Sequence, residues 1–170
     1  PSGKLAETYA ERYMDVPSAR YYPGRQNTAE HRESIFIGYR YFDTAKKPVR
    51  WPFGFGLTYT TFAYDEIVVN GNDVSCSIRN TGDRAGEEIV QVYVHKANDT
   101  DGPIKTLRGF QRVEVEAGKT GQTVISLPYT SFGFFDRTSG KMDVTAGDYE
   151  VFYGNSSDGR DLKMTRIRVQ

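Results

Sequence analysis

The stretch EEIVQVYVHK, Glu87–Lys96, alternates apolar and polar side chains with a period of two. In an extended strand its valines share one face: Val90, Val92 and Val94. The residues between them lie on the other face, which we expect to be the polar one: Gln91, Tyr93 and His95. The stretch therefore predicts a half-buried β-strand whose valines face a hydrophobic core.

Four other runs show the same alternation: DVSCSIRN, TVISLP, DYEVFYG and TRIRVQ. Turn sequences such as NGND, EAGKTG and TAGD separate the runs. About seven or eight short strands with this spacing predict an all-β sandwich of immunoglobulin-like architecture over residues 62–170. The expected inward residues are Val74, Cys76, Ile78, Val90, Val92, Val94, Ile125, Leu127, Val151 and Ile167.

Residues 1–61 have little periodicity, and Tyr, Arg, Pro and Gly are scattered through them. At their end, WPFGFGLTYTTFAY, Trp51–Tyr64, places six aromatic rings in fourteen residues. Disordered chains are poor in aromatic residues, and exposed apolar patches mark interfaces. We therefore expect a largely irregular arm that packs on another surface and is poorly ordered where nothing covers it.

The composition excludes several classes of function. The 170 residues include 22 Lys and Arg and 22 Asp and Glu, so the formal net charge is zero and gives no electrostatic basis for binding nucleic acid or a membrane. No apolar run approaches the ~20 residues that span a bilayer. Cys76 is the only cysteine, which excludes an internal disulfide and a zinc site with several thiolates. The first residues do not resemble a signal peptide, and the sequence indicates no compartment.

The chemical motifs are weak. AGKT, Ala117–Thr120, lacks the earlier glycine of a phosphate-binding loop and lies between two expected strands, so it predicts a turn. His31 and His95 are far apart and favour solvated roles over metal binding. Carboxylates near turns and strand ends are expected to be solvated: Asp65, Glu66, Glu87, Glu88, Asp136 and Asp143. The sequence therefore predicts no catalytic, metal or cofactor site in this chain.

A carbohydrate-binding module without hydrolytic activity is an alternative function. Tyr21, Tyr22 and Trp51 could stack on sugar rings. Because they lie outside the strand-rich region that would form a rigid platform, we favour packing against protein. An adhesion or spacer domain would show tandem repeats, and the sequence contains none.

Several blocks, in order, resemble the C-terminal part of family-3 glycoside hydrolases of the β-glucosidase type. PSGKLAETYA resembles the segment that closes the α/β-sandwich domain of that family. SIFIGYRYFDT and WPFGFGLTYTTFAY resemble its GIFVGYRYYDT and FPFGYGLSYTTFEY stretches. IRNTGDRAGEEIVQVYV, LRGFQRVEVEAGKT and AGDYEVFYGNSS resemble its fibronectin type III-like domain. The sequence departs from the pattern at Ser34, where the family usually has Gly.

The resemblance implies that residues 1–61 are the tail of the α/β-sandwich domain and a linking arm, and that residues 62–170 are a fibronectin type III-like domain. It implies a retaining hydrolase that removes terminal β-linked sugars. The family's nucleophilic Asp lies on a barrel domain and its acid/base lies before the SGKL segment, so neither motif falls in this chain. The expected partners are the remaining domains of the same enzyme, with a homo-oligomer possible. A segment such as Tyr21–Glu33 could reach the rim of the active site.

Overall fold

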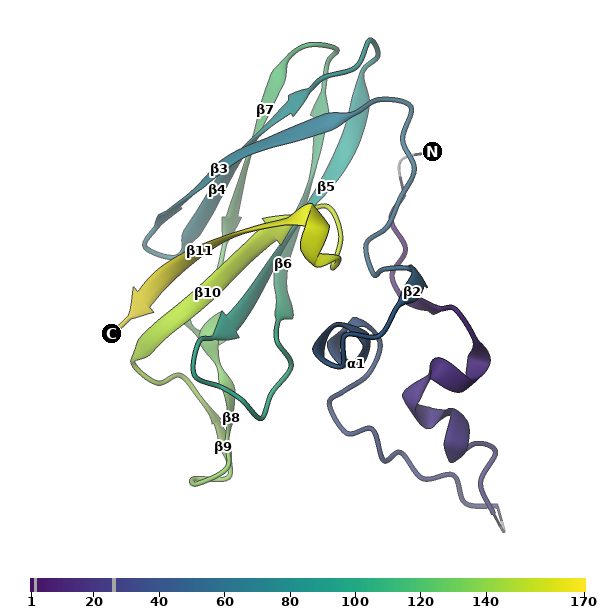
Figure 1. Ribbon diagram of the computed structural model, residues 1–170. Coiled ribbons are helices and arrows are strands. Elements are labelled where there is room, and N and C mark those ends of the chain that lie inside the picture. The colour runs from purple at the N-terminus through teal and green to yellow at the C-terminus, as the bar shows by residue number, and fades with distance from the viewer. Residues whose placement is uncertain (2, 26) are drawn as a thin grey trace.

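A computed structural model of the chain describes residue 1, residues 3–25 and residues 27–170. Two antiparallel sheets pack face to face, and an arm formed by the N-terminal third of the chain lies beside them (Figure 1). One sheet has the strand order β11-β10-β5-β6, and the other has the order β3-β4-β7. The all-β sandwich expected from the alternating sequence pattern is confirmed.

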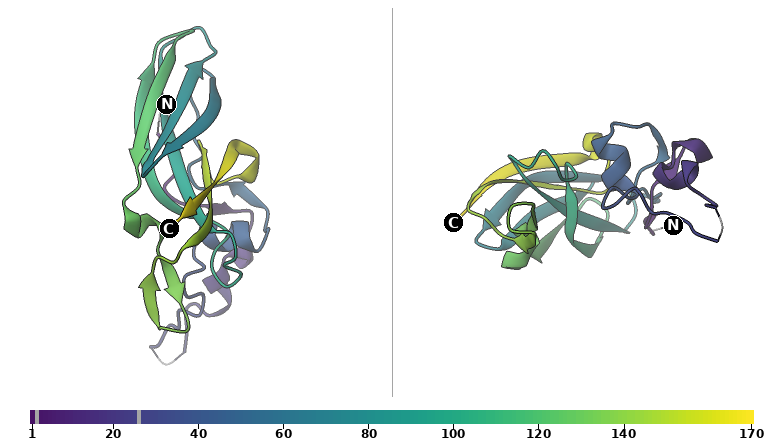
Figure 2. Two further views of the ribbon diagram at one scale, coloured as in Figure 1. Left: turned by 90° about the vertical axis from the view of Figure 1, so that its left-hand side faces the viewer. Right: turned by 90° about the horizontal axis from the view of Figure 1, so that it is seen from below.

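The sandwich strands are β3 (Phe62–Asn70), β4 (Asp73–Asn80), β5 (Gly86–Lys96), β6 (Thr106–Val115), β7 (Thr120–Ser126), β10 (Gly147–Gly154) and β11 (Leu162–Val169). A separate hairpin consists of β8 (Phe134–Asp136) and β9 (Lys141–Asp143). It projects from one end of the sandwich (Figure 2). Two 3-10 turns, η3 (Tyr129–Phe132) and η4 (Gly159–Asp161), precede β8 and β11. The AGKT segment forms the turn between β6 and β7, in which Gly118 has a φ of 68°.

The core lies between the two sheets, as the alternation predicts. Nine of the ten residues expected to point inward are buried there: Val74, Cys76, Ile78, Val90, Val92, Val94, Ile125, Leu127 and Val151. Ile167, on the edge strand β11, is only partly buried and packs against this cluster. Tyr149, Tyr153 and Phe132 complete the core.

The arm contains five short elements: β1 (Tyr9–Ala10), η1 (Tyr13–Asp15), η2 (Pro17–Arg20), α1 (Tyr39–Thr44) and β2 (Val49–Trp51). β1 and β2 pair with each other, and α1 lies next to the sandwich (Figure 1). The rest of the arm is irregular, as expected. Gln26, within the segment Tyr21–Glu33, lies outside the described residues.

The prediction that the second face of β5 is polar and solvated was wrong. Gln91 is 3% exposed and Tyr93 is completely buried. His95 is half-buried, with Nδ1 3.2 Å from the carbonyl oxygen of Pro103. The physical reason is that the arm covers this face, so β5 is buried on both sides.

Candidate functional site

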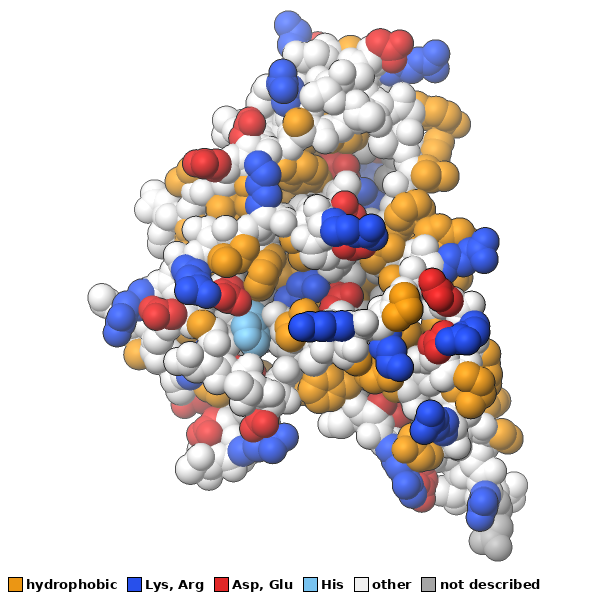
Figure 3. Space-filling view, in the orientation of Figure 1, with side chains coloured by type: hydrophobic (Ala, Val, Ile, Leu, Met, Phe, Trp, Pro, Cys, Tyr) orange, Lys and Arg blue, Asp and Glu red, His pale blue; other side chains and the backbone are white. Residues whose placement is uncertain are grey.

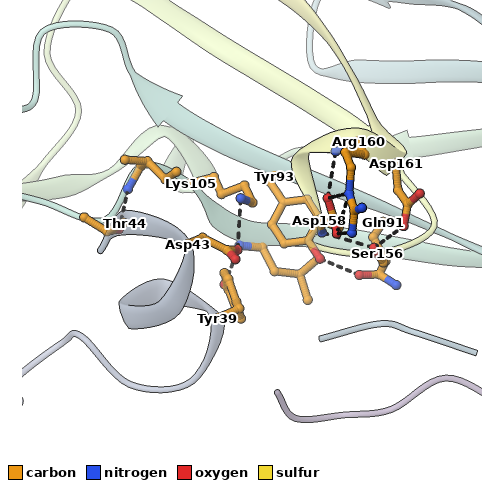
Figure 4. A network of polar contacts seen from close by, with 12 residues as sticks. Tyr39, Asp43, Thr44, Gln91, Tyr93, Lys105, Ser156, Asp158, Arg160 and Asp161 are labelled. Atoms are coloured by element: carbon orange, nitrogen blue, oxygen red, sulfur yellow. Dashed lines mark hydrogen bonds and ion pairs between the residues drawn. The ribbon is translucent and has the colours of Figure 1, made fainter. Parts of the chain in front are cut away.

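A network of polar contacts joins the arm to the sandwich, and Figure 4 shows its main members. Helix α1 is the centre of the arm side. Phe42 is 2% exposed, and the Tyr39 ring packs against Tyr93 and Phe53 at centroid distances of 5.6 and 4.9 Å. The Tyr39 hydroxyl accepts a hydrogen bond from the Leu107 amide at 2.8 Å. The helix is therefore fixed to the β5–β6 face by apolar and polar contacts together.

An ion pair joins the end of α1 to the residue before β6. Asp43 Oδ2 lies 2.9 Å from Lys105 Nζ, and both side chains are largely buried. Burial raises the pKa of Asp43, and the nearby Lys105 ammonium opposes this rise. Next to the pair, Thr44 Oγ1 accepts a hydrogen bond from the Ile104 amide at 3.1 Å. A buried carboxylate is stable only when it is paired. The ion pair between Asp43 and Lys105 therefore fixes the position of α1 relative to the start of β6.

The aromatic stretch Trp51–Tyr64 also contacts β5, at Gly54. Gly54, with a φ of 81°, lies against Gln91, and a Cβ atom at this position would be 2.2 Å from Gln91 Nε2. The amide nitrogen of Gln91 donates to the carbonyl oxygen of Asn155 at 2.9 Å, and its oxygen accepts from Tyr93 Oη at 2.5 Å. The close approach of the backbone thus requires glycine and lets this segment lie directly on β5.

The loop before β11 closes the network. The Ser157 amide donates to the carbonyl oxygen of Phe53 at 2.8 Å, and Ser156 Oγ donates to Asp161 Oδ2 at 2.7 Å. Asp158 caps the following 3-10 turn by accepting from the Arg160 amide at 2.9 Å. Hydrogen bonds from the Arg160 side chain are the main cause of the lowered pKa of Asp158. These bonds hold the loop in the conformation in which the Ser157 amide bonds to Phe53 of the aromatic stretch.

The extreme N-terminal segment contacts both the aromatic stretch and the sandwich. Leu5 exchanges backbone hydrogen bonds with Gly54 and Phe55, each of 2.8 Å. Lys4 Nζ lies 2.7 Å from Glu88 Oε1, and the Glu88 side chain is 3% exposed. The prediction that Glu88 is solvated was therefore wrong, because the N-terminal segment covers it and supplies a countercharge. Sequence alternation could not reveal this pairing, since the two residues are distant in the chain.

The remaining expected carboxylates have ordinary surroundings. Asp65, Glu66 and Asp143 are exposed, as expected. Glu87 pairs with Arg112 at 2.7 Å on the surface, and Asp136 accepts hydrogen bonds from the amides of the turn that follows it. His31 is exposed, with Nδ1 3.2 Å from Glu33 Oε1. Within residues 1, 3–25 and 27–170, no group of three or more His, Cys, Asp or Glu side chains could hold a metal ion.

The rings proposed for sugar stacking lie on two parts of the arm. Trp51 contacts Tyr9 edge-on at 5.6 Å and Phe55 at 6.4 Å, and the Arg50 guanidinium lies 4.8 Å from its ring. Tyr21 lies under the guanidinium of Arg32 at 5.0 Å. Tyr22 is 66% exposed. Trp51 thus packs against protein, whereas the two tyrosines lie near the irregular end of the arm.

The outer side of the arm is rich in exposed apolar groups, which Figure 3 shows in orange along the arm. Ten large apolar residues of the arm are exposed: Tyr9, Tyr13, Met14, Tyr21, Tyr22, Ile35, Ile37, Trp51, Leu57 and Tyr59. So many exposed large apolar side chains on one segment indicate an interface. None of the helices in the described part of the chain is long and apolar enough to span a bilayer.

Comparison with known proteins relates the chain to longer proteins. Residues 88–157 match the model of a fibronectin type III-like domain. The xylan 1,4-β-xylosidase of Xylanibacter ruminicola and the thermostable β-glucosidase B of Acetivibrio thermocellus are each 36% identical over 99% of this chain. The alignments cover 19% and 23% of the two relatives, so the chain spans about a fifth of their length.

Solved structures give the same result. The crystal structure of the GH3 β-glucosidase of Bifidobacterium adolescentis matches 99% of this chain with a TM-score of 0.89 and 35% identity, and the match covers 26% of that protein. β-Glucosidase 3B of Thermotoga neapolitana matches 100% of this chain with a TM-score of 0.90 and 34% identity, over 25% of its own length. The chain therefore corresponds to the C-terminal part of family-3 glycoside hydrolases of the β-glucosidase type, including their fibronectin type III-like domain.

Proposed function

We propose that this chain is the C-terminal portion of a retaining glycoside hydrolase that cleaves terminal β-linked sugars from oligosaccharides or glycosides. The observation that carries the proposal is the match over almost the whole chain, arm included, to β-glucosidases and a xylan 1,4-β-xylosidase that are about four to five times longer. A similarity confined to the sandwich would indicate only a common module. Because the irregular arm is matched as well, the similarity includes the part that joins the module to its enzyme.

Within that enzyme, we assign residues 1–61 to the tail of the α/β-sandwich domain and the linking arm, and residues 62–170 to the fibronectin type III-like domain. The exposed apolar side chains of the arm support an interface with the remaining domains. The buried network behind them supports a rigid connection, because α1 and the aromatic stretch are fixed to β5 and β6. The role of the chain is thus structural, and the catalytic carboxylates belong to the other domains.

The chemistry of retaining hydrolysis supports this division. The reaction needs two carboxyl groups about 5–5.5 Å apart across the scissile bond, one of them with a raised pKa. Among the described carboxylates, Asp43 and Glu88 are largely buried, and each is neutralised by a lysine. An ion-paired carboxylate inside a packed interface is not accessible to a sugar. Neither residue is therefore assigned a catalytic role.

The test uses the natural polypeptide that contains this sequence. Its intact mass should correspond to several hundred residues, and it should hydrolyse an aryl β-glucoside with retention of the anomeric configuration. Retention is measured by proton NMR of the first product formed. A natural polypeptide of 170 residues, or an inverting reaction, would contradict the proposal. Sugar retention by the isolated chain on an affinity gel would instead favour the carbohydrate-binding alternative.

A further inference from the structure

A second concave region lies away from the network, between the arm and the β8–β9 hairpin. It is a cleft of about 460 Å³ whose walls come from residues 34–40, the end of β5, the start of β6 and the hairpin. Figure 3 shows the hollow between the two lower projections of the molecule. None of the residues labelled in Figure 4 lines this cleft.

Two arginines line this cleft without an ion-pair partner among the described residues. Arg40 comes from α1 and Arg108 from β6, and among the described residues neither forms an ion pair. Arg108 Nη2 donates to the carbonyl oxygen of Gly133 at 2.6 Å, while its Nε is buried and has no acceptor. Burial lowers the pKa of Arg108, and the positive charge of Arg40 adds to this lowering. A buried donor without an acceptor in the protein, beside a second cation, gives this part of the cleft a charge that complements an anionic group.

The other charged groups of the cleft already have partners. Asp99 accepts hydrogen bonds from the amides of Asp101 and Gly102, each of 3.0 Å. Asp101 pairs with Arg137 at 3.5 Å. Lys96 lies over the Phe134 ring at 4.1 Å and donates to the Thr145 hydroxyl. Neither acidic group of the cleft forms an ion pair with Arg40 or Arg108.

The rim of the cleft is apolar on both sides. Ile35 on the arm is 47% exposed, and Phe135 and Met142 on the hairpin are 56% and 63% exposed. Phe135 and Met142 are cross-strand partners, so they form one apolar surface. A small free anion would leave this surface in water. A segment of polypeptide would cover it while its acidic side chain reached the arginines.

We propose that the cleft binds an acidic side chain carried by an apolar segment of polypeptide. Arg40 and Arg108 hold the carboxylate, since a guanidinium matches carboxylate geometry with two parallel donors. Ile35, Phe135 and Met142 cover the apolar residues on either side of it. The proposal rests on the charge and shape of the cleft.

The test measures binding of a defined peptide to the 170-residue chain. The probe is N-acetyl-Phe-Asp-Phe-amide, and its matched control is N-acetyl-Phe-Asn-Phe-amide. Two-dimensional NMR of the arginine Nε–H groups reports directly on Arg108. The acid peptide should shift this resonance and bind at least about tenfold more tightly than the control, because a charge-assisted hydrogen bond is lost in the amide. Equal binding of both peptides, or no shift with the acid peptide at 20 mM, would overturn the proposal.

Variants of the two arginines test the charged part of the site. Arg108→Gln and Arg40→Gln should each weaken binding of the acid peptide about tenfold and leave the amide peptide unchanged. Arg40 has no hydrogen-bond partner among the described residues, so its replacement preserves the fold. The control is Arg168→Gln, because Arg168 is exposed on β11 and lies 3.9 Å from Asp148. Loss of binding in the control variant would contradict the assignment.

The apolar rim needs its own measurement. Sodium acetate carries the same charge as the acid peptide but has no apolar flanks, so it should bind at least tenfold more weakly. Met142→Ser, on the exposed face of the hairpin, should weaken the peptide and leave acetate unchanged. Acetate binding as tightly as the peptide would show a simple anion site and would overturn the polypeptide part of the proposal.

Discussion

Val92 lies at the centre of the sandwich, with its side chain fully buried between the two sheets. Val92→Asp would place an unpaired charge among apolar groups, and we expect it to lower the free energy of unfolding by more than about 4 kcal/mol. Val68→Asp is the matched control, because Val68 is 61% exposed on β3. Chemical denaturation measures both. An unchanged midpoint for Val92→Asp would contradict the core.

Cys76 is 4% exposed in the same core, and burial raises the pKa of its thiol to about 11. Since the thiolate is the reactive form, only about one thiol in a thousand is ionised at pH 8. We expect the native chain to react with Ellman's reagent at least about a hundredfold more slowly than the denatured chain at that pH. The native rate should keep rising tenfold per pH unit up to pH 10, whereas the denatured rate levels off near pH 9. Equal rates at pH 8 would be inconsistent with this packing.

The ion pair between Lys4 and Glu88 should matter more than an exposed pair. Lys4→Met leaves the buried Glu88 carboxylate without a countercharge, so we expect a loss of about 3–5 kcal/mol, limited by the free energy that holds the N-terminal segment in place. Arg12→Met breaks an exposed pair with Asp15 and should cost less than about 1 kcal/mol. Thermal unfolding of the two variants makes the comparison. The double variant Lys4→Met/Glu88→Gln should recover part of the loss, and additive losses would argue against direct coupling.

At the scale of elements, α1 depends on its contacts. A helix of six residues is not stable alone, so its packing on the sandwich must hold it. Phe42→Ala removes a ring that is 2% exposed and should weaken this packing by about 3–5 kcal/mol. Hydrogen exchange by mass spectrometry should show faster exchange over residues 38–47 and unchanged exchange in β4 and β7. Uniformly faster exchange through the sandwich would mean that the arm and sandwich unfold as one unit.

The strands could be predicted from the sequence because their signal is local. Alternation in EEIVQVYVHK gives the inward face of β5 directly, since successive side chains point to opposite sides. The same signal failed for the other face, where Tyr93 and Gln91 are buried under the arm. A polar side chain covered by a distant segment has the same sequence pattern as one facing water. For that reason the sequence also missed the pairs Lys4–Glu88 and Asp43–Lys105.

At the scale of the whole molecule, the two sides of the arm differ. Its inner side is fixed to β5 and β6, and its outer side exposes aromatic and aliphatic groups (Figure 3). The sequence indicated an interface through its ring content, and resemblance to a family indicated its partner. The division between inner and outer rings required the structure. Tyr39 and Phe53, for example, pack inward, whereas Tyr13 and Tyr59 are exposed.

The central claim is that this chain supplies a rigid C-terminal part and that the catalytic carboxylates lie in the remaining domains. The direct test is hydrolysis of an aryl β-glucoside by the chain alone, by the remaining domains alone and by an equimolar mixture of the two polypeptides. We predict no turnover by the chain alone and restored turnover in the mixture. Turnover by the chain alone that is abolished by replacing one of its own carboxylates would contradict the account.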